Sequence, residues 1–120
     1  MPITSRCNSR CKTCNVWKYK DNKDIDPIAL EKALSDPFFS EVTAVGLNGG
    51  EFTLVPNFID ILKAVLTLPK IRYIALISNG LLPSKLFAYL EQVKEICTIR
   101  NVKFNICISV DGFGERHEFV

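Results

Sequence analysis

Apolar residues follow two alternating patterns along this chain. Near-continuous apolar runs predict buried strands over 1–6, 42–47, 71–77 and 103–110. Apolar residues three and four positions apart predict helices over 26–34, 56–66 and 83–96. Parallel strands need long crossover connections, and helices between apolar strands supply them. We therefore expect an α/β fold of parallel βα repeats with right-handed crossovers, four strands and three helices.

Local signals support the first predicted helix. Asp26 can cap the free backbone amides, and Pro27 suits the first helical position. The apolar faces expected for the first and third helices are Ile28, Leu30, Ala33 and Leu34, and Leu86, Phe87, Leu90, Val93 and Ile96.

Composition excludes several classes of protein. The chain has 120 residues, 48% of them hydrophobic and 23% charged, as in one ordinary globular domain. No apolar run approaches the roughly 18 residues of a membrane span, and no basic segment followed by an apolar one suggests a secretory signal. We expect a cytoplasmic protein that binds neither membrane nor nucleic acid, and the net charge of +2 says little about its partners. The basic stretch near the start is either a solvated loop face or a surface for an anion or partner.

Three of the five cysteines form a C-x3-C-x2-C pattern, Cys7, Cys11 and Cys14, directly after the first strand. Such crowding suits metal binding better than disulfides in a chain without a secretory signal. Three thiolates can hold one iron–sulfur cluster and leave one iron open to another ligand. Cys97 and Cys107 lie in apolar segments, where we expect small buried side chains. A structural zinc site that adds Cys97, Cys107 or His117 is the alternative.

Each strand is followed by an unusual motif. Ligands gather at the carboxyl ends of the strands in parallel sheets, so these motifs should share one rim. In chain order they are the cysteine loop, Gly49-Gly50-Glu51, Ser78-Asn79-Gly80 and Ser109-Val110-Asp111-Gly112.

The second and third motifs have a functional and an ordinary interpretation. Gly49 and Gly50 allow the main chain to approach a ligand, or make a tight turn. Glu51 offers a carboxylate for an ammonium group, or is a solvated loop acid. Ser78 and Asn79 offer a hydroxyl and an amide, although Asn-Gly is also a common turn.

The fourth motif continues a polar strand face. Ser109 and Asp111 alternate with apolar residues and share a face with Asn105 and Cys107. This face suits a ribose or a polar substrate in a barrel-like lumen, or it is a solvent-facing edge.

With these motifs in this order on a βα pattern, the chain resembles the N-terminal part of a radical S-adenosylmethionine (SAM) enzyme. Cys-Asn-Ser-Arg-Cys-Lys-Thr-Cys with Ser-Val-Asp-Gly is most similar to the SPASM or twitch branch. The resemblance implies a partial TIM-type β/α barrel, of which residues 1–120 are a truncated core domain, incomplete at the C-terminus.

The resemblance also implies cofactors and roles. Cys7, Cys11 and Cys14 would ligate a [4Fe–4S] cluster whose fourth iron is chelated by SAM. Gly49, Gly50 and Glu51 would lie along the methionyl amino group, Ser78 and Asn79 near the SAM carboxylate or sugar, and Ser109 and Asp111 near the ribose or substrate.

The implied activity is that of an oxidoreductase or peptide-modifying maturase. One electron, from a reductant such as flavodoxin or ferredoxin, would cleave SAM to a 5′-deoxyadenosyl radical that abstracts hydrogen from an unknown substrate, a peptide among the candidates. Thr13 stands where the family has a large apolar residue against the adenine, and Val16, Trp17 or Tyr19 could replace it. The alternatives are a catalytically inactive fragment of such an enzyme or a small zinc-binding module.

Overall fold

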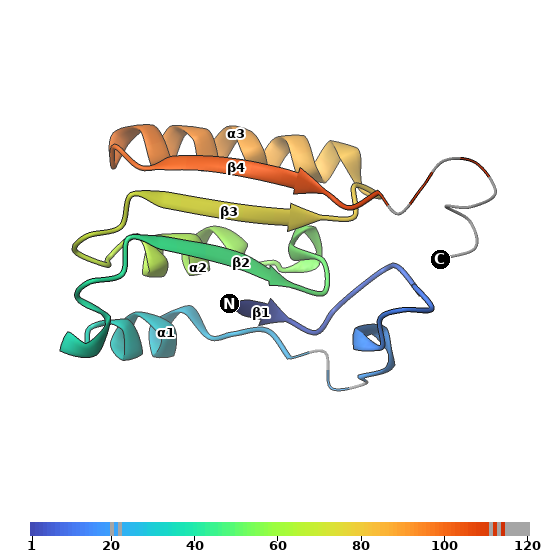
Figure 1. Cartoon of the computed structure of the whole chain (residues 1–120), viewed down its shortest axis with the longest axis horizontal. Helices are drawn as coiled ribbons and strands as arrows, with labels where there is room; N and C mark the ends of the chain where they lie inside the picture. Colours follow the sequence, from blue (N-terminus) through green and yellow to red (C-terminus); the bar gives the residue numbers. More distant parts are fainter. Residues whose placement is uncertain (20, 22, 111, 113, 115–120) are drawn as a thin grey trace.

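The structure is a computed structural model that describes residues 1–19, 21, 23–110, 112 and 114. Its four strands form one parallel sheet in the order β1-β2-β3-β4. They are β1 (Pro2–Thr4), β2 (Ala44–Gly49), β3 (Tyr73–Ser78) and β4 (Lys103–Ile108). All four arrows in Figure 1 point the same way, and the cysteine loop lies beyond their tips. The predicted α/β fold of parallel βα repeats is confirmed.

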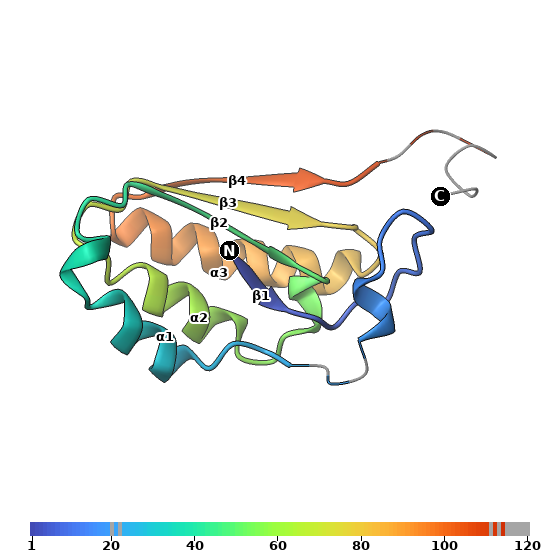
Figure 2. The same ribbon diagram turned by 60° about the horizontal axis from the view of Figure 1, so that its bottom comes forward.

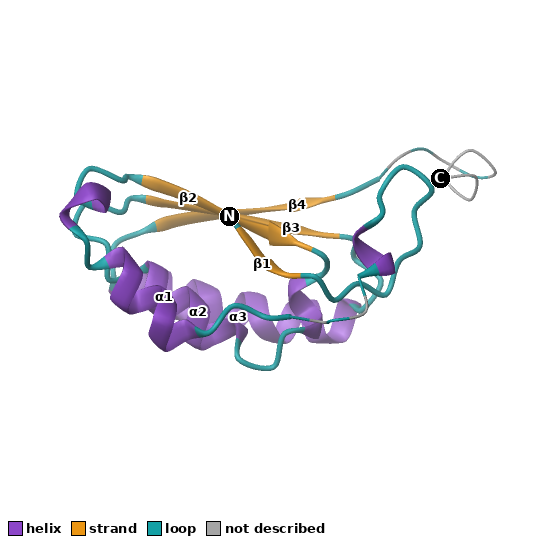
Figure 3. Cartoon of the chain, turned by 90° about the horizontal axis from the view of Figure 1, so that it is seen from below, coloured by secondary structure: helices purple, strands orange, loops and turns teal. Residues whose placement is uncertain are grey.

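The three α-helices of the described chain cover one face of the sheet and leave the other face open (Figures 2 and 3). They are α1 (Pro27–Leu34), α2 (Phe58–Val65) and α3 (Pro83–Ile99). Short 3₁₀ helices lie at Val16–Lys18, Pro37–Phe39 and Phe52–Leu54. None of the helices described here has the length and apolarity needed to cross a membrane.

The strands alternate between the helical layer and the open face. Leu47, Ile74 and Leu76 are fully buried under the helices. Lys103, Asn105 and Cys107 are exposed on the opposite face of β4. Cys107 is therefore not the small buried side chain that the apolar run predicted, whereas Cys97 on α3 is buried as expected.

Most predicted elements are present with shifted ends. Asp26 caps α1 as expected, accepting bonds from the amides of Ile28 and Ala29. The carbonyl of Thr43 accepts from the amides of both Arg72 and Tyr73, at 2.7 and 3.1 Å. These two bonds join the chain just before β2 to the start of β3, and the strands begin at residues 44 and 73.

Three apolar residues assigned to helical faces are exposed instead, namely Ile28, Ala33 and Phe87. Ile28 is 78% exposed and Phe87 is 65% exposed. Ile28 and Leu30 are two positions apart, which places them on different sides of a helix, and Leu30 is the residue that packs into the core. Phe87 likewise follows the buried Leu86 by one position and points away from the core.

Candidate functional site

The cysteine loop is closed at its base by pairing between β1 and residues 23–25. The amide of Ile25 donates to the carbonyl of Ile3 at 2.8 Å, and the amide of Ser5 donates to the carbonyl of Lys23 at 3.1 Å. Asp24 accepts from the hydroxyl of Thr4 at 2.6 Å and from Nε of Arg6 at 2.9 Å. Because these contacts fix both ends of the loop, the cysteines between them occupy a defined place beyond the sheet.

Inside the loop, polar groups of Ser9 contact two of the three sulfur atoms. The amide of Ser9 donates to Sγ of Cys7 at 3.4 Å, and its hydroxyl lies 3.0 Å from Sγ of Cys11. The indole N–H of Trp17 donates to the carbonyl of Cys11 at 3.2 Å. Cys7 and Cys11 are half-buried, and Cys14 is exposed.

Burial raises the pKa of the Cys7 thiol above its ordinary value. The amide of Ser9 opposes this shift, and the charges of Cys11, Glu51 and Cys14 add to it. The three cysteines thus lie within electrostatic reach of one another around Cys7. A cation at this site would replace the thiol proton and offset the same repulsion.

The donor set suits a cluster rather than a single ion. Within the described ranges, no three histidine, cysteine, aspartate or glutamate side chains are gathered closely enough to hold one metal ion. A four-iron cluster spreads its thiolates around a larger body, and three free thiols in one anchored loop, with N–H and O–H donors at two sulfurs, fit that group. His117, part of the zinc alternative, lies outside the described residues.

The two glycines of the second motif allow close passage of the chain against β1. Gly49 has a φ of 128°, and a Cβ built on it would lie 2.4 Å from the carbonyl oxygen of Thr4. A Cβ on Gly50 would lie 1.8 Å from the carbonyl oxygen of Arg6. Main-chain bonds run through the same contact, from the amide of Gly50 to Thr4 and from the amide of Glu51 to Arg6. The close approach that these glycines permit is thus to the segment that leads into the cysteine loop.

Glu51 is fully buried, with 0% of its surface exposed. Oε1 accepts from the amide and hydroxyl of Thr53, at 3.1 and 2.8 Å. The hydroxyl of Ser78 donates to both carboxylate oxygens, and the amide of Asn79 donates to Oε2 at 2.8 Å. The carboxylate therefore ties the end of β3 to the loop after β2, and a contact with an ammonium group stays a prediction.

The other predicted residues lie at the same rim. Ser78 is buried beside Glu51, and Asn79 reaches the cysteine loop through a bond of 2.8 Å from Nδ2 to Oδ1 of Asn8. Ser109 is exposed, and its amide donates to the carbonyl of Ser78 at 2.9 Å. Asp111 lies outside the described residues.

Sequence reasoning missed the supporting residues Asn8, Ser9 and Thr53. All three are small polar residues within two positions of a predicted site residue, which is the signal that could have identified them. It also missed an aromatic cluster that includes Phe52, the residue after Glu51. The rings of Phe52 and Phe58 lie 4.6 Å apart, and Tyr89 packs 5.3 Å from Phe58.

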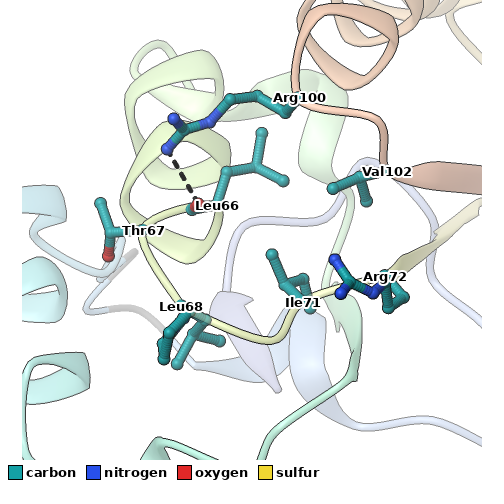
Figure 4. Close-up of a pocket in the computed structure, with 8 residues that line it drawn as sticks. Leu66, Thr67, Leu68, Ile71, Arg72, Arg100 and Val102 are labelled. Atoms are coloured by element: carbon teal, nitrogen blue, oxygen red, sulfur yellow. Dashed lines mark hydrogen bonds between the residues drawn. The ribbon is translucent and has the colours of Figure 1, made fainter.

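Cavities lie at both ends of the sheet. The pocket in Figure 4, about 260 Å³, is at the amino ends of the strands, and there Nη2 of Arg100 donates to the carbonyl of Leu66 at 3.0 Å. Arg100 thereby caps the end of α2, away from the cysteines. Another cavity of about 430 Å³ lies beside the base of the cysteine loop, and its lining includes Val16, Tyr19 and Gly49.

Comparison with known proteins gives two matches. The model of the radical SAM superfamily matches residues 1–120. A GTP 3′,8-cyclase from Trichodesmium erythraeum (strain IMS101) is 31% identical over 94 residues, covering 70% of this chain. The aligned part spans 27% of that relative's length. This cyclase lends no support to the narrower resemblance to the SPASM or twitch branch.

Proposed function

The chain belongs to the radical SAM superfamily, and on that premise we propose that Cys7, Cys11 and Cys14 hold a [4Fe–4S] cluster beside a SAM-binding rim. The observation that carries the proposal is the attachment of the cysteine loop to the ends of β2 and β3. Asn79 bonds to Asn8 inside the loop, and Glu51 bonds to Arg6 at its start. The three thiols therefore lie where parallel sheets bind their ligands.

The residues of this chain bind and orient the two cofactors. The three thiolates hold the cluster, and the amide of Ser9 and the hydroxyl beside Cys11 stabilise charge on the sulfurs. The main chain at Gly49 and Gly50 forms the adjacent rim. Glu51 holds this segment in place by accepting hydrogen bonds from Ser78 and Asn79 at the end of β3. When bound, the cluster and SAM supply one-electron cleavage of the sulfonium and a radical that abstracts hydrogen from the substrate.

The cavity beside the loop base is the proposed place for the adenosyl group. Its volume of about 430 Å³ is within the range of small-molecule sites. Val16 and Tyr19 line it, and they are two of the three residues expected to replace the apolar residue absent at Thr13. Ser109, exposed at the end of β4, and Asp111 are the residues proposed to face the ribose or the substrate.

The substrate is proposed from the relative and from the family resemblance. The similarity to a GTP 3′,8-cyclase makes GTP the first substrate to test, and the resemblance to maturases makes peptides the second. A flavodoxin or ferredoxin is the proposed electron donor. The chain aligns with about a quarter of that cyclase. Catalytic activity of these 120 residues by themselves is therefore part of the same proposal.

Anaerobic reconstitution with iron and sulfide tests the cluster. We expect a brown protein with about four irons per chain. A Cys11→Ala variant should lose the colour and most of the iron, whereas Cys107→Ala, which changes an exposed cysteine of β4 outside the loop, should load normally. A colourless protein that takes up one zinc per chain would instead support the zinc-binding module.

Dithionite reduction in the presence of SAM tests the activity. Loaded protein should release 5′-deoxyadenosine, and the Cys11→Ala variant should release none. A loaded protein that releases none would be an inactive fragment. Release that persists in Cys11→Ala would refute the ligand role of that cysteine.

A further inference from the structure

The side chain of Asn79 joins the end of β3 to the cysteine loop, 71 residues away in sequence from Asn8. Its Nδ2 donates to Oδ1 of Asn8 at 2.8 Å and also faces Sγ of Cys7 at 4.0 Å. Its Oδ1 accepts from the amide of Leu81 at 3.0 Å. The bond to Leu81 identifies the oxygen end of the amide, so the nitrogen end points to the loop.

Asn79 is itself held in place by buried groups. Its main-chain amide donates to Oε2 of Glu51 at 2.8 Å, and the hydroxyl of Ser78 accepts from the amide of Gly80 at 3.0 Å. Gly80 has a φ of 72°, which lets the chain turn directly after Asn79. The amide therefore extends from a rigid point of the fold toward a loop that lies outside the sheet.

The bonds of this side chain leave little capacity for another ligand. One N–H is used by Asn8, the other is directed toward the sulfur of Cys7, and the oxygen is used by Leu81. A contact between the N–H groups of Asn79 and the SAM carboxylate would need one of these bonds to break. The geometry favours a role toward the polypeptide.

We propose that Asn79 is a positioning residue that fixes Cys7, through Asn8, in the place from which it binds the cluster. The consequence for the cluster rests on the proposed function, whereas the link between Asn79 and the loop does not. Outer partners that orient metal ligands typically contribute 10- to 100-fold to metal affinity. Asn79 acts on the loop from β3, which is two strands away from β1, so the positions of the cysteines depend on the end of β3.

Alkylation of the cluster-free protein tests the link without any cofactor. Iodoacetamide labelling at Cys7, divided by labelling at the exposed Cys14, reports how far the loop protects Cys7. Asn79→Leu should raise this ratio about fivefold, the effect of losing one hydrogen bond of ordinary net strength. Asn79→Leu also removes the N–H that faces the sulfur of Cys7, and this loss by itself would raise the thiol pKa and slow alkylation. Faster alkylation of Cys7 in this variant therefore reports that the loop has been released.

Variants of Asn8 separate this link from a general loss of stability. Asn8→Leu removes the acceptor and should raise the ratio as Asn79→Leu does. The double variant should add no further increase, because both substitutions break the same bond. Asn8→Asp keeps an acceptor and should not raise the ratio. Asn57→Leu, which changes an asparagine with no side-chain capping bond, is the matched control.

Iron release provides the second readout. After reconstitution, Asn79→Leu and Asn8→Leu should lose iron to a chelator about 10-fold faster than wild type, and Asn57→Leu should not. An unchanged labelling ratio in Asn79→Leu, or an additive double variant, would overturn the positioning role. If wild-type protein takes up no cluster, the proposed function fails, and the labelling ratio still decides the role of Asn79.

Discussion

A Cβ atom built on Gly50 would lie 1.8 Å from the carbonyl oxygen of Arg6, closer than any side chain can approach. The Gly-Gly pair therefore has a structural requirement of its own, apart from any ligand. It lets the loop after β2 bond to the residues that lead into Cys7. The cysteine loop and the glycine motif form one unit, although 42 residues separate Cys7 from Gly49.

We predict that Gly50→Ala lowers the free energy of unfolding by about 2–4 kcal/mol, since the added methyl group overlaps rigid backbone. The control is Gly46→Ala on β2, where no atom lies within 4 Å of the new Cβ, and it should be neutral within about 1 kcal/mol. Urea denaturation measures both. Equal stability of the two variants would contradict the contact between residues 50 and 6.

Replacement of the buried Glu51 carboxylate should also be costly. In Glu51→Gln, one oxygen becomes an NH₂ group that faces the donors Ser78 and Asn79 or Thr53. The loss of a charge-assisted bond and the new donor–donor contact should destabilise the protein by about 2–3 kcal/mol.

Thermal unfolding compares Glu51→Gln with Glu91→Gln, a change at an exposed position of α3 that should have little effect. If both variants have the melting temperature of the wild type, the hydrogen bonds of the Glu51 carboxylate do not stabilise the fold.

The sheet and the common rim could be predicted because both depend on local patterns. Apolar runs locate the strands, helical spacing identifies the connections between them, and parallel pairing brings the strand ends together. The capping of α1 by Asp26 depends on neighbouring residues in the same way. Such features require no knowledge of distant contacts.

The roles of Glu51, Gly50 and Asn79 depend on contacts with segments far away in sequence. Glu51 bonds to Ser78, 27 residues later, and Asn79 to Asn8, 71 residues earlier. Local sequence makes Glu51 an ordinary loop acid, since nothing beside it shows that donors from another strand surround it. Cys107 was placed wrongly because an apolar run does not show which of its alternating positions face the helices.

The raised pKa of Cys7 predicts the pH dependence of its alkylation in cluster-free protein. Burial disfavours the thiolate, so the reactive fraction should appear at higher pH than for an unshielded cysteine. The labelling rate at Cys7 should reach half of its maximum at a higher pH than the labelling rate of free cysteine. Mass spectrometry of Cys7 peptides across a pH series measures this. A half-maximal rate at a lower pH than for free cysteine would show that the hydrogen bond from the amide of Ser9 outweighs the effect of burial on the pKa of Cys7.

The ion pair between Arg6 and Asp24 should keep the base of the cysteine loop closed. Nε of Arg6 contacts both oxygens of Asp24, at 3.1 and 2.9 Å, and Thr4 donates to the same carboxylate. The Arg6 side chain is 42% exposed, so solvent weakens the pair, and we expect Asp24→Asn to cost about 1 kcal/mol.

The effect of Asp24→Asn should be local, because the carboxylate lies beside the amides that close the loop. Hydrogen exchange at Ser5 and Ile25, which donate across that closure, should become several-fold faster, while exchange at Ile74 in β3 should not change. Glu41→Gln removes the exposed pair with Lys70 and should leave all three amides as they were. Equal acceleration at Ile74 would mean that Asp24 supports the whole sheet rather than the base of the cysteine loop.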